Sequence, residues 1–211
     1  MNRLLKFIIV FVLLIISLSS ISAKQEIWMD ASFYADTEII PSKFKSLGYF
    51  SAYDNANAVG RVGPAFTITY FPFDIARIGL IVSAHTQFPI GCISGTPIPL
   101  FSQQTGFFSH HFDYRQDFAI GIAYNQMFGD LVGIFLDASV ALQLNRVASN
   151  NNKNNNNFEY YQFATTNLVA RLGLLNKSDS VYFKIGGAVN YDIKNKAGIN
   201  YALFAGCGLI F

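Results

Sequence analysis

The sequence is poor in charged residues, and its one long apolar run lies near the amino terminus. Asp, Glu, Lys and Arg make up 13% of the 211 residues, whereas 52% are hydrophobic. Beyond residue 23, no stretch approaches the roughly 18 consecutive apolar residues that mark a transmembrane helix. We therefore expect no membrane-spanning helix in that part of the chain.

Cysteine is also scarce. Cys92 and Cys207 are the only two, too few for the framework of a disulfide-rich secreted fold. We expect both thiols to be unpaired, with Cys92 in a loop and Cys207 near the end of the last strand. There Cys207 would serve as a small apolar residue.

The amino terminus has the three parts of a secretory signal peptide. Arg3 and Lys6 supply positive charge, residues 7–16 are all apolar, and the residues that follow are small and mostly polar. Cleavage after Ser22 and cleavage after Ala23 both fit this pattern. An uncleaved membrane anchor is the less favoured alternative, because the apolar run is shorter than the roughly 20 residues that span a bilayer.

We therefore expect residues 1–23 to be the signal peptide and residues 24–211 to form one domain. The leader holds two of the 15 basic residues, so 13 basic and 13 acidic residues remain, and the mature chain is formally neutral. A neutral chain does not indicate nucleic acid as a partner.

The mature chain is rich in Phe and Tyr, and its apolar residues alternate with small or polar ones. In residues 199–211, one face is mostly apolar with aromatic ends and the other is mostly small or polar. This period of two indicates a β-strand. Eight segments show it, at residues 26–36, 61–71, 75–87, 117–125, 131–145, 167–175, 181–193 and 199–211. Pro64 weakens the start of the second segment, because proline cannot donate to a strand ladder.

The connections between these segments alternate in length. Short connections lie at residues 72–74, 126–130 and 175–179, and longer or more polar ones lie at residues 37–57, 88–111, 148–157 and 194–198. Four loops on one rim and three turns on the other, with both chain ends on the turn side, predict an all-β, eight-stranded antiparallel up-and-down transmembrane β-barrel. A soluble barrel is less favoured, because its outside would need more charge than the Gly, Ala, Ser and Asn seen here.

The chain resembles the small bacterial outer-membrane β-barrels, the group that includes OmpX and the OmpA membrane domain. The terminal Phe211, with alternating apolar residues behind it, is similar to the carboxy-terminal signal of such barrels. Tyr201 fits this signal, whereas Leu209 stands where an aromatic residue is often found. The resemblance implies a bacterial outer-membrane protein in contact with lipid and lipopolysaccharide or an equivalent. It also implies the barrel-insertion machinery as a partner that reads Phe211.

An eight-stranded barrel has a lumen that side chains can fill. Five charged residues of both signs are predicted to point inward: Arg77, Asp117, Asp137, Arg171 and Lys184. Buried charges are tolerated when they are paired, so we expect a plug of internal salt bridges. A narrow polar or ion path is the alternative.

The sequence shows no motif for catalysis, for a cofactor or for a metal ion. The three histidines are His85, His110 and His111, and the last two stand close to Ser109 and Asp113. Adjacency in sequence does not supply the geometry of a Ser-His-Asp triad. Neighbouring residues of a strand point to opposite faces, which disfavours joint metal binding by the histidine pair. We therefore predict no catalytic, cofactor-binding or metal-binding residues.

These observations favour a non-enzymatic outer-membrane barrel with a structural or surface-interaction role, such as adhesion, through its extracellular loops. The loops at residues 88–111 and 148–157 are the candidate surfaces for a host or surface ligand, since function on such scaffolds usually resides in loops. A small pore or a lipid A-modifying barrel enzyme is the alternative.

Overall fold

The computed structural model describes residues 25–39, 58–72, 77–92, 114–149, 159–193 and 199–211. These residues form eight strands and no helix: β1 (Glu26–Ile39), β2 (Ala58–Phe71), β3 (Ile78–Cys92), β4 (Tyr114–Phe128), β5 (Val132–Ser149), β6 (Glu159–Lys177), β7 (Val181–Asp192) and β8 (Ile199–Ile210). None of the described residues belongs to a helix long and apolar enough to cross a membrane.

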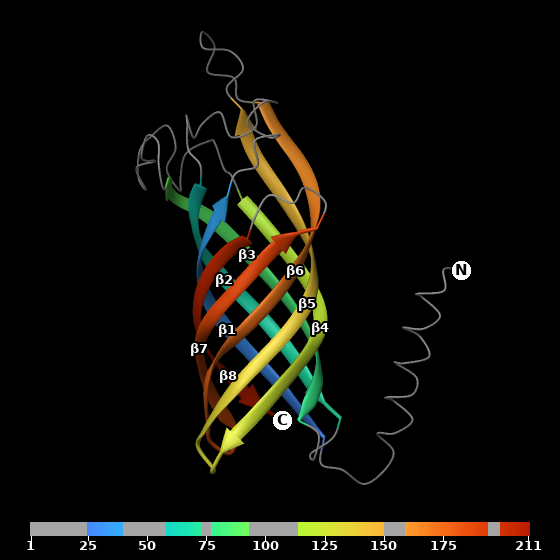
Figure 1. Ribbon diagram of the computed structural model, residues 1–211, viewed down its shortest axis with the longest axis vertical. Coiled ribbons are helices and arrows are strands. Elements are labelled where there is room, and N and C mark those ends of the chain that lie inside the picture. The colour runs from blue at the N-terminus through green and yellow to red at the C-terminus, as the bar shows by residue number, and fades with distance from the viewer. Residues whose placement is uncertain (1–24, 40–57, 73–76, 93–113, 150–158, 194–198) are drawn as a thin grey trace, which may run out of the picture.

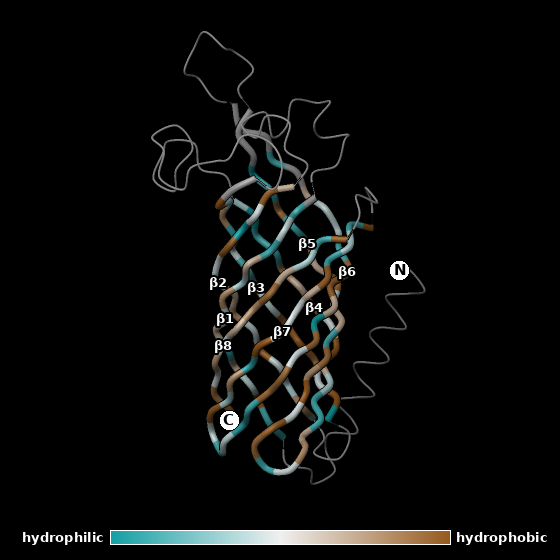
Figure 2. Tube along the Cα trace, turned by 60° about the vertical axis from the view of Figure 1, so that its left-hand side comes forward, coloured by the Kyte–Doolittle hydropathy of each residue, from teal (hydrophilic) through white to brown (hydrophobic). Residues whose placement is uncertain are grey.

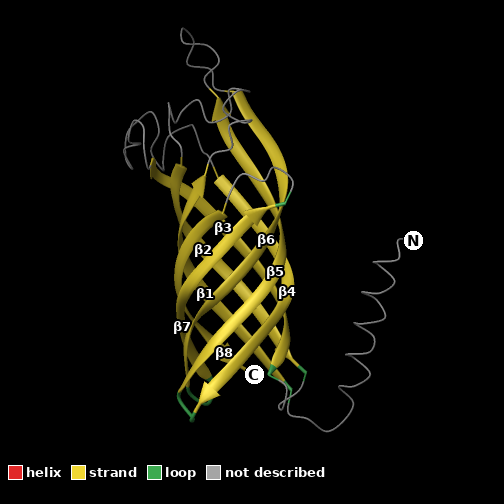
Figure 3. Ribbon diagram, viewed as in Figure 1, coloured by secondary structure: helices red, strands yellow, loops and turns green. Residues whose placement is uncertain are grey.

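Each strand pairs antiparallel with the next in sequence, and β1 pairs with β8, so the sheet closes into a barrel (Figure 1, Figure 3). The two ends of the sheet are joined at the turn side. Ile27 N–H donates to Phe211 C=O at 3.0 Å, and Phe211 N–H donates to Ile27 C=O at 2.9 Å. A closed barrel leaves no strand edge unpaired along its wall, which the hydrocarbon of a bilayer requires. The predicted eight-stranded up-and-down barrel is confirmed.

The two faces of the wall differ as the alternation predicted. Large apolar side chains point outward, among them Ile120 at 66% and Leu203 at 72% exposure. Polar and charged side chains point inward and are buried, among them Arg61 at 0% and Asn167 at 1%. Figure 2 shows brown and teal residues alternating along the strands. An apolar outer face is stable in contact with lipid and not in contact with water, so the described barrel is suited to span a bilayer.

Aromatic side chains stand near both ends of this outer face. Phe183 and Phe211 are exposed near the turn side, and Tyr201 and Tyr191 near the loop side. Aromatic girdles at these heights are typical of outer-membrane barrels.

The strand boundaries differ from the sequence prediction mainly at the loop side. β4 begins at Tyr114, three residues before the predicted segment, and β6 begins at Glu159 rather than at residue 167. Cys92 is the last residue of β3 and not part of a loop, which corrects that prediction. Cys207 is free and lies on the outer face of β8, as expected. Polar residues at strand ends carry no alternation signal, which explains why these extensions were missed.

Pro64 lies inside β2 rather than at its start. The β2–β3 ladder runs from Val59 to Val62 and resumes at Ala65, so it is interrupted beside Pro64. Pro64 is paired with Phe33 of β1 but with no residue of β3, so the missing N–H of proline is tolerated at this break in the β2–β3 ladder.

Candidate functional site

The described residues that could carry chemistry gather in the barrel lumen. Its loop-side layer is a network of two arginines and three carboxylates from β1, β2 and β4. Arg61 Nε donates to Glu38 Oε2 at 2.5 Å. Arg115 donates to Asp36, and its Nε lies 3.3 Å from Asp117 Oδ2. Each arginine thus pairs with a buried carboxylate, whose negative charge would be unfavourable in the lumen without a cation beside it.

The middle of the lumen is occupied by a buried pair and a stack of rings. Arg171 Nε donates to Asp137 Oδ1 at 2.7 Å, and Arg171 NH1 donates to the Tyr34 hydroxyl at 2.9 Å. The Tyr34 ring stacks on Phe204 at 4.8 Å and lies 4.6 Å from the His85 ring, measured between centroids. This layer joins β1, β3, β5, β6 and β8 across the full width of the barrel.

The turn side of the lumen has a second charge cluster. Lys184 Nζ lies 2.7 Å from both carboxylate oxygens of Asp30, and the Tyr182 hydroxyl donates to the same carboxylate at 2.8 Å. Ser32 donates to Asp30 as well, at 2.8 Å. Three donors therefore surround one carboxylate that is only 2% exposed.

Below this cluster, aromatic rings close the turn-side end. Trp28 lies 5.3 Å from Phe71 and 4.7 Å from Tyr182, measured between ring centroids. Lys177 Nζ stands 4.9 Å from the Trp28 ring centroid and 3.1 Å from Glu26 Oε2. The lumen is thus filled by two charge layers, a central ring stack and this aromatic floor, as expected for eight strands.

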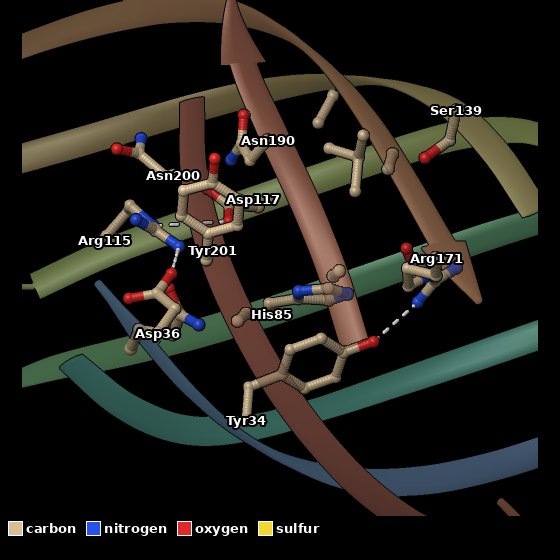
Figure 4. Close-up of a pocket in the computed structure, with 17 residues that line it drawn as sticks. Tyr34, Asp36, His85, Arg115, Asp117, Ser139, Arg171, Asn190, Asn200 and Tyr201 are labelled. Atoms are coloured by element: carbon tan, nitrogen blue, oxygen red, sulfur yellow. Dashed lines mark hydrogen bonds and ion pairs between the residues drawn. The ribbon is translucent and has the colours of Figure 1, made fainter. Parts of the chain in front are cut away.

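Among the described residues, two small chambers lie between these layers. The loop-side chamber, of about 30 Å³, lies between the arginine network and the Tyr34 layer (Figure 4). The turn-side chamber, also of about 30 Å³, lies around Asp30 and Lys184. Each has room for about two water molecules, so neither is a substrate pocket or a channel.

Four of the five charged residues predicted to point inward do so: Asp117, Asp137, Arg171 and Lys184 are buried in the lumen. Arg77 is half-buried and lies outside the strands, so its predicted place on the inward face of a strand is wrong. Arg77 precedes β3, has a positive φ of 45°, and its carbonyl accepts a hydrogen bond from Asn125 N–H. It belongs to the connection after β2, because β3 begins only at Ile78.

Six further buried charges were not singled out from the sequence: Asp30, Asp36, Glu38, Arg61, Arg115 and Asp192. Asp30 and Arg61 stand on the inward face of predicted strands, so the alternation itself could have found them. Glu38 was assigned to a loop, because the predicted first strand ended too early, and Arg115 preceded the predicted fourth strand, which began too late. Longer strands on the loop side were the missing information.

Of the three histidines, His85 lies in the lumen, and His110 and His111 lie outside the described residues. The candidate surface loops, at residues 88–111 and 148–157, are described only in part. Their first residues prolong β3 and β5, and residues 93–113 and 150–158 lie outside the described residues. The signal peptide falls outside them too and stays a prediction.

The apolar outer wall, the filled lumen and the up-and-down order of the strands together define the architecture. The fold is that of a small outer-membrane β-barrel. The chain is similar to Neisserial surface protein A, with a TM-score of 0.55 at 13% identity over 88% of this chain and 96% of that one. It is also similar to Ail, the attachment invasion locus protein of Yersinia pestis, solved with the heparin analogue sucrose octasulfate. Here the TM-score is 0.51 at 12% identity, over 89% of this chain and 99% of that one.

These likenesses confirm the predicted resemblance to the small eight-stranded barrels at the level of the fold. No family model and no curated protein matches the chain. The outward apolar wall and the closed ladder place the protein in a bacterial outer membrane, because closed barrels are the only sheets that cross a bilayer and small ones of this design belong to that membrane.

Proposed function

We propose that this protein is a non-enzymatic outer-membrane barrel that acts through the structure it presents beyond its loop-side rim. The filled lumen supports this proposal, since ion pairs and rings occupy the space where a channel or a substrate pocket would lie. The function then resides in the parts that leave the membrane, as is usual for rigid scaffolds with long connections.

The observation that carries the proposal is a two-stranded extension of the barrel. β5 has 18 residues and β6 has 19, whereas β7 and β8 have 12 each. The β5–β6 ladder continues to Ser149 and Glu159, but the β6–β7 ladder ends at Asn167 and Asp192. The hairpin rises beyond its neighbours at the top of Figure 1.

One edge of this extension is open among the residues that the structure describes. The last contact of β6 with the β7 side is Ile193 N–H donating to Thr166 C=O at 3.0 Å. Backbone groups alternate in direction along a strand, so those of Gln162 and Ala164 also face that side. Both side chains are exposed, and no described strand pairs with this edge.

An open edge is a template on which an extended peptide can add a strand. Ladder hydrogen bonds would supply affinity, and alternate side chains would supply specificity. The partner that this surface fits is an extended peptide segment of another protein. The likeness to Ail agrees with a surface role, and its sulfated ligand names a second kind of molecule to test.

The test uses the full protein in lipid nanodiscs and short random peptides displayed on phage. Recovered peptides should bind the wild type, and Gln162→Pro should weaken binding by at least about tenfold, a change of 1.4 kcal/mol. Proline removes an N–H that no described strand uses, so the β5–β6 pairs should stay intact. Gln162→Ser is the matched control and should bind as the wild type does.

Peptides that bind Gln162→Pro and the wild type equally would refute the open edge as the contact surface. Binding of sucrose octasulfate without any peptide binding would move the interaction to the loops. Stable single-channel steps in a planar bilayer would favour the pore instead. Altered acyl chains in the lipid A of cells that carry the protein would favour the enzyme.

The predicted recognition of Phe211 by the barrel-insertion machinery is also a proposal. Phe211 is 66% exposed, and its backbone is paired with Ile27, so its ring is available at the turn-side end of the seam. Slower membrane assembly of Phe211→Ala in cells, with unchanged stability of the folded variant, is the expected result.

A further inference from the structure

The loop-side chamber collects most of the buried polar atoms that lack a protein partner. Seven atoms stand out on its walls because neither a hydrogen bond nor an ion pair reaches them: Asp36 Oδ1, His85 Nε2, Gln87 Oε1, Asp117 Oδ1, Ser139 Oγ, Arg171 Nη2 and Asn190 Oδ1. The atoms themselves are buried, and so are most of their side chains, with Gln87 and Arg171 at 1% and Ser139 at 6% exposure. They come from β1, β3, β4, β5, β6 and β7, so the cluster is a product of barrel closure.

The turn-side chamber provides a comparison within the same molecule. Its volume is the same, about 30 Å³, and it is lined by polar residues that include Asp30, Asn125 and Lys184. No residue of its lining has a buried side-chain nitrogen or oxygen without a partner among the described atoms. Unmet hydrogen-bonding capacity is therefore concentrated in the loop-side chamber and is not a general property of the lumen.

A buried polar atom without a partner costs roughly 1–3 kcal/mol, so a cluster of seven requires a ligand that satisfies several at once. Four of the seven are carboxylate or amide oxygens, which only accept hydrogen bonds, and the guanidinium nitrogen of Arg171 only donates. The species that satisfies them must therefore both donate and accept hydrogen bonds. Water donates two hydrogen bonds per molecule, and one molecule needs about 10–15 Å³. Both the donor requirement and the volume are met by about two waters.

A metal cation is the other species that oxygen atoms could hold, and the charges of the chamber disfavour it. The guanidinium groups of Arg115 and Arg171 line the same chamber. Figure 4 shows Arg115 between Asp36 and Asp117. The described residues contain no cluster of three or more His, Cys, Asp or Glu side chains placed to hold a metal. A neutral donor fits where a second cation would be repelled.

We propose that the loop-side chamber binds a cluster of about two ordered water molecules that join Gln87, Ser139 and Asn190 to the carboxylates of the arginine network. The water cluster completes the hydrogen bonds of Asp36 and Asp117 that Arg115 leaves unmet. The Tyr34 layer is the floor of the site and separates it from the turn-side chamber. The lumen thus holds its ligand as a fixed part of the fold.

The proposal is tested by solution NMR of the full protein in nanodiscs, with water-to-protein cross-relaxation as the signal. Long-lived water should give cross-peaks to the side-chain amides of Gln87 and Asn190. Gln87→Leu removes one acceptor and should reduce the Asn190 cross-peak at least about twofold, since each water depends on 2–4 polar partners. Gln116→Leu makes the same change on the neighbouring outward position of β4 and should leave that cross-peak unchanged.

Absence of water cross-peaks at both amides of the folded wild type would overturn the proposal. A sodium or potassium resonance shift that follows salt concentration at these amides would replace water with a cation and would overturn it as well. Because the wild type alone gives this answer, the test does not depend on folding of Gln87→Leu. A gel shift between boiled and unboiled samples reports whether each variant is folded.

Discussion

Lys184 on β7 and Asp30 on β1 form an ion pair across the lumen, with the ammonium nitrogen 2.7 Å from both carboxylate oxygens. The two residues are 154 positions apart in sequence. Both are buried, so the pair is shielded from water and from salt. It shows how the barrel accommodates charges that the hydrocarbon around it would not.

Lys184→Met should destabilise the protein strongly. It leaves Asp30 buried without its cation, and breaking one side of a buried pair costs about 3–5 kcal/mol. Asp30→Asn combined with Lys184→Met should recover part of this loss, because the amide keeps an acceptor for Tyr182 and carries no charge. Urea unfolding in lipid vesicles measures both. Equal stability of Lys184→Met and the wild type would contradict the pairing.

Arg115 should be the most sensitive residue of the loop-side network. It contacts Asp36 and Asp117, and its NH1 lies 3.8 Å from Glu38. Arg115→Met should cost at least about 3–5 kcal/mol. Arg115→Lys should restore only part of the loss, because an ammonium group cannot serve several carboxylates in the planar geometry of a guanidinium.

Arg146 offers the matched control for this experiment. It lies on β5 with its guanidinium carbon 5.9 Å from the Tyr114 ring centroid. Its side chain is half-buried, whereas that of Arg115 is 2% exposed, so Arg146→Met should cost less stability than Arg115→Met. Similar losses of stability in Arg146→Met and Arg115→Met would contradict a particular contribution of the loop-side network to stability.

The loss of stability caused by a charged residue on the outer wall should depend on the depth of that residue in the bilayer. Ile120 lies in the middle of β4 and is 66% exposed, whereas Phe128 ends the strand at 60% exposure. Ile120→Arg should destabilise the barrel by about 2–4 kcal/mol and Phe128→Arg by about 0–1 kcal/mol. Vesicle unfolding titrations check the difference. Equal losses at the two positions would contradict the placement of the bilayer.

The fluorescence of Trp28 should be poorly quenched by lipid. Trp28 is the single tryptophan of the chain, and it is 5% exposed and packed inside the lumen. Brominated acyl chains reach only the outer wall and should therefore quench it weakly. Leu209→Trp in a Trp28→Phe background moves the indole to the outer face of β8 and should be quenched strongly. Similar quenching of both proteins would show that Trp28 faces lipid.

Much of this architecture was predictable because its cause is local. Alternation with a period of two places Ile120 outside and Asp117 inside from the sequence alone, and it identified all eight strands. The lumen partners were less accessible. Asp137 and Arg171 could be predicted to point inward, but their pairing with each other, and that of Arg171 with Tyr34, depends on which strands face one another across the barrel.

The strand ends were the weakest part of the prediction. Glu159 and Arg115 lie in segments without apolar alternation, so nothing local marks them as strand residues. Both segments are held by pairing with a neighbour, Glu159 with Ser149 and Arg115 with Asn145. Arg77 shows the opposite error, since the apolar alternation begins at residue 75, whereas β3 begins only at Ile78.

The sequence by itself determined the number of strands, the lipid-facing side of each and the presence of both charge signs in the lumen. These follow from the pleat, which sends successive side chains to opposite faces. The tertiary structure decided which charges meet, where the chambers lie and how far β5 and β6 extend beyond the rim. Closure fixes the stagger between strands, and the stagger sets the height at which residues far apart in sequence share the lumen.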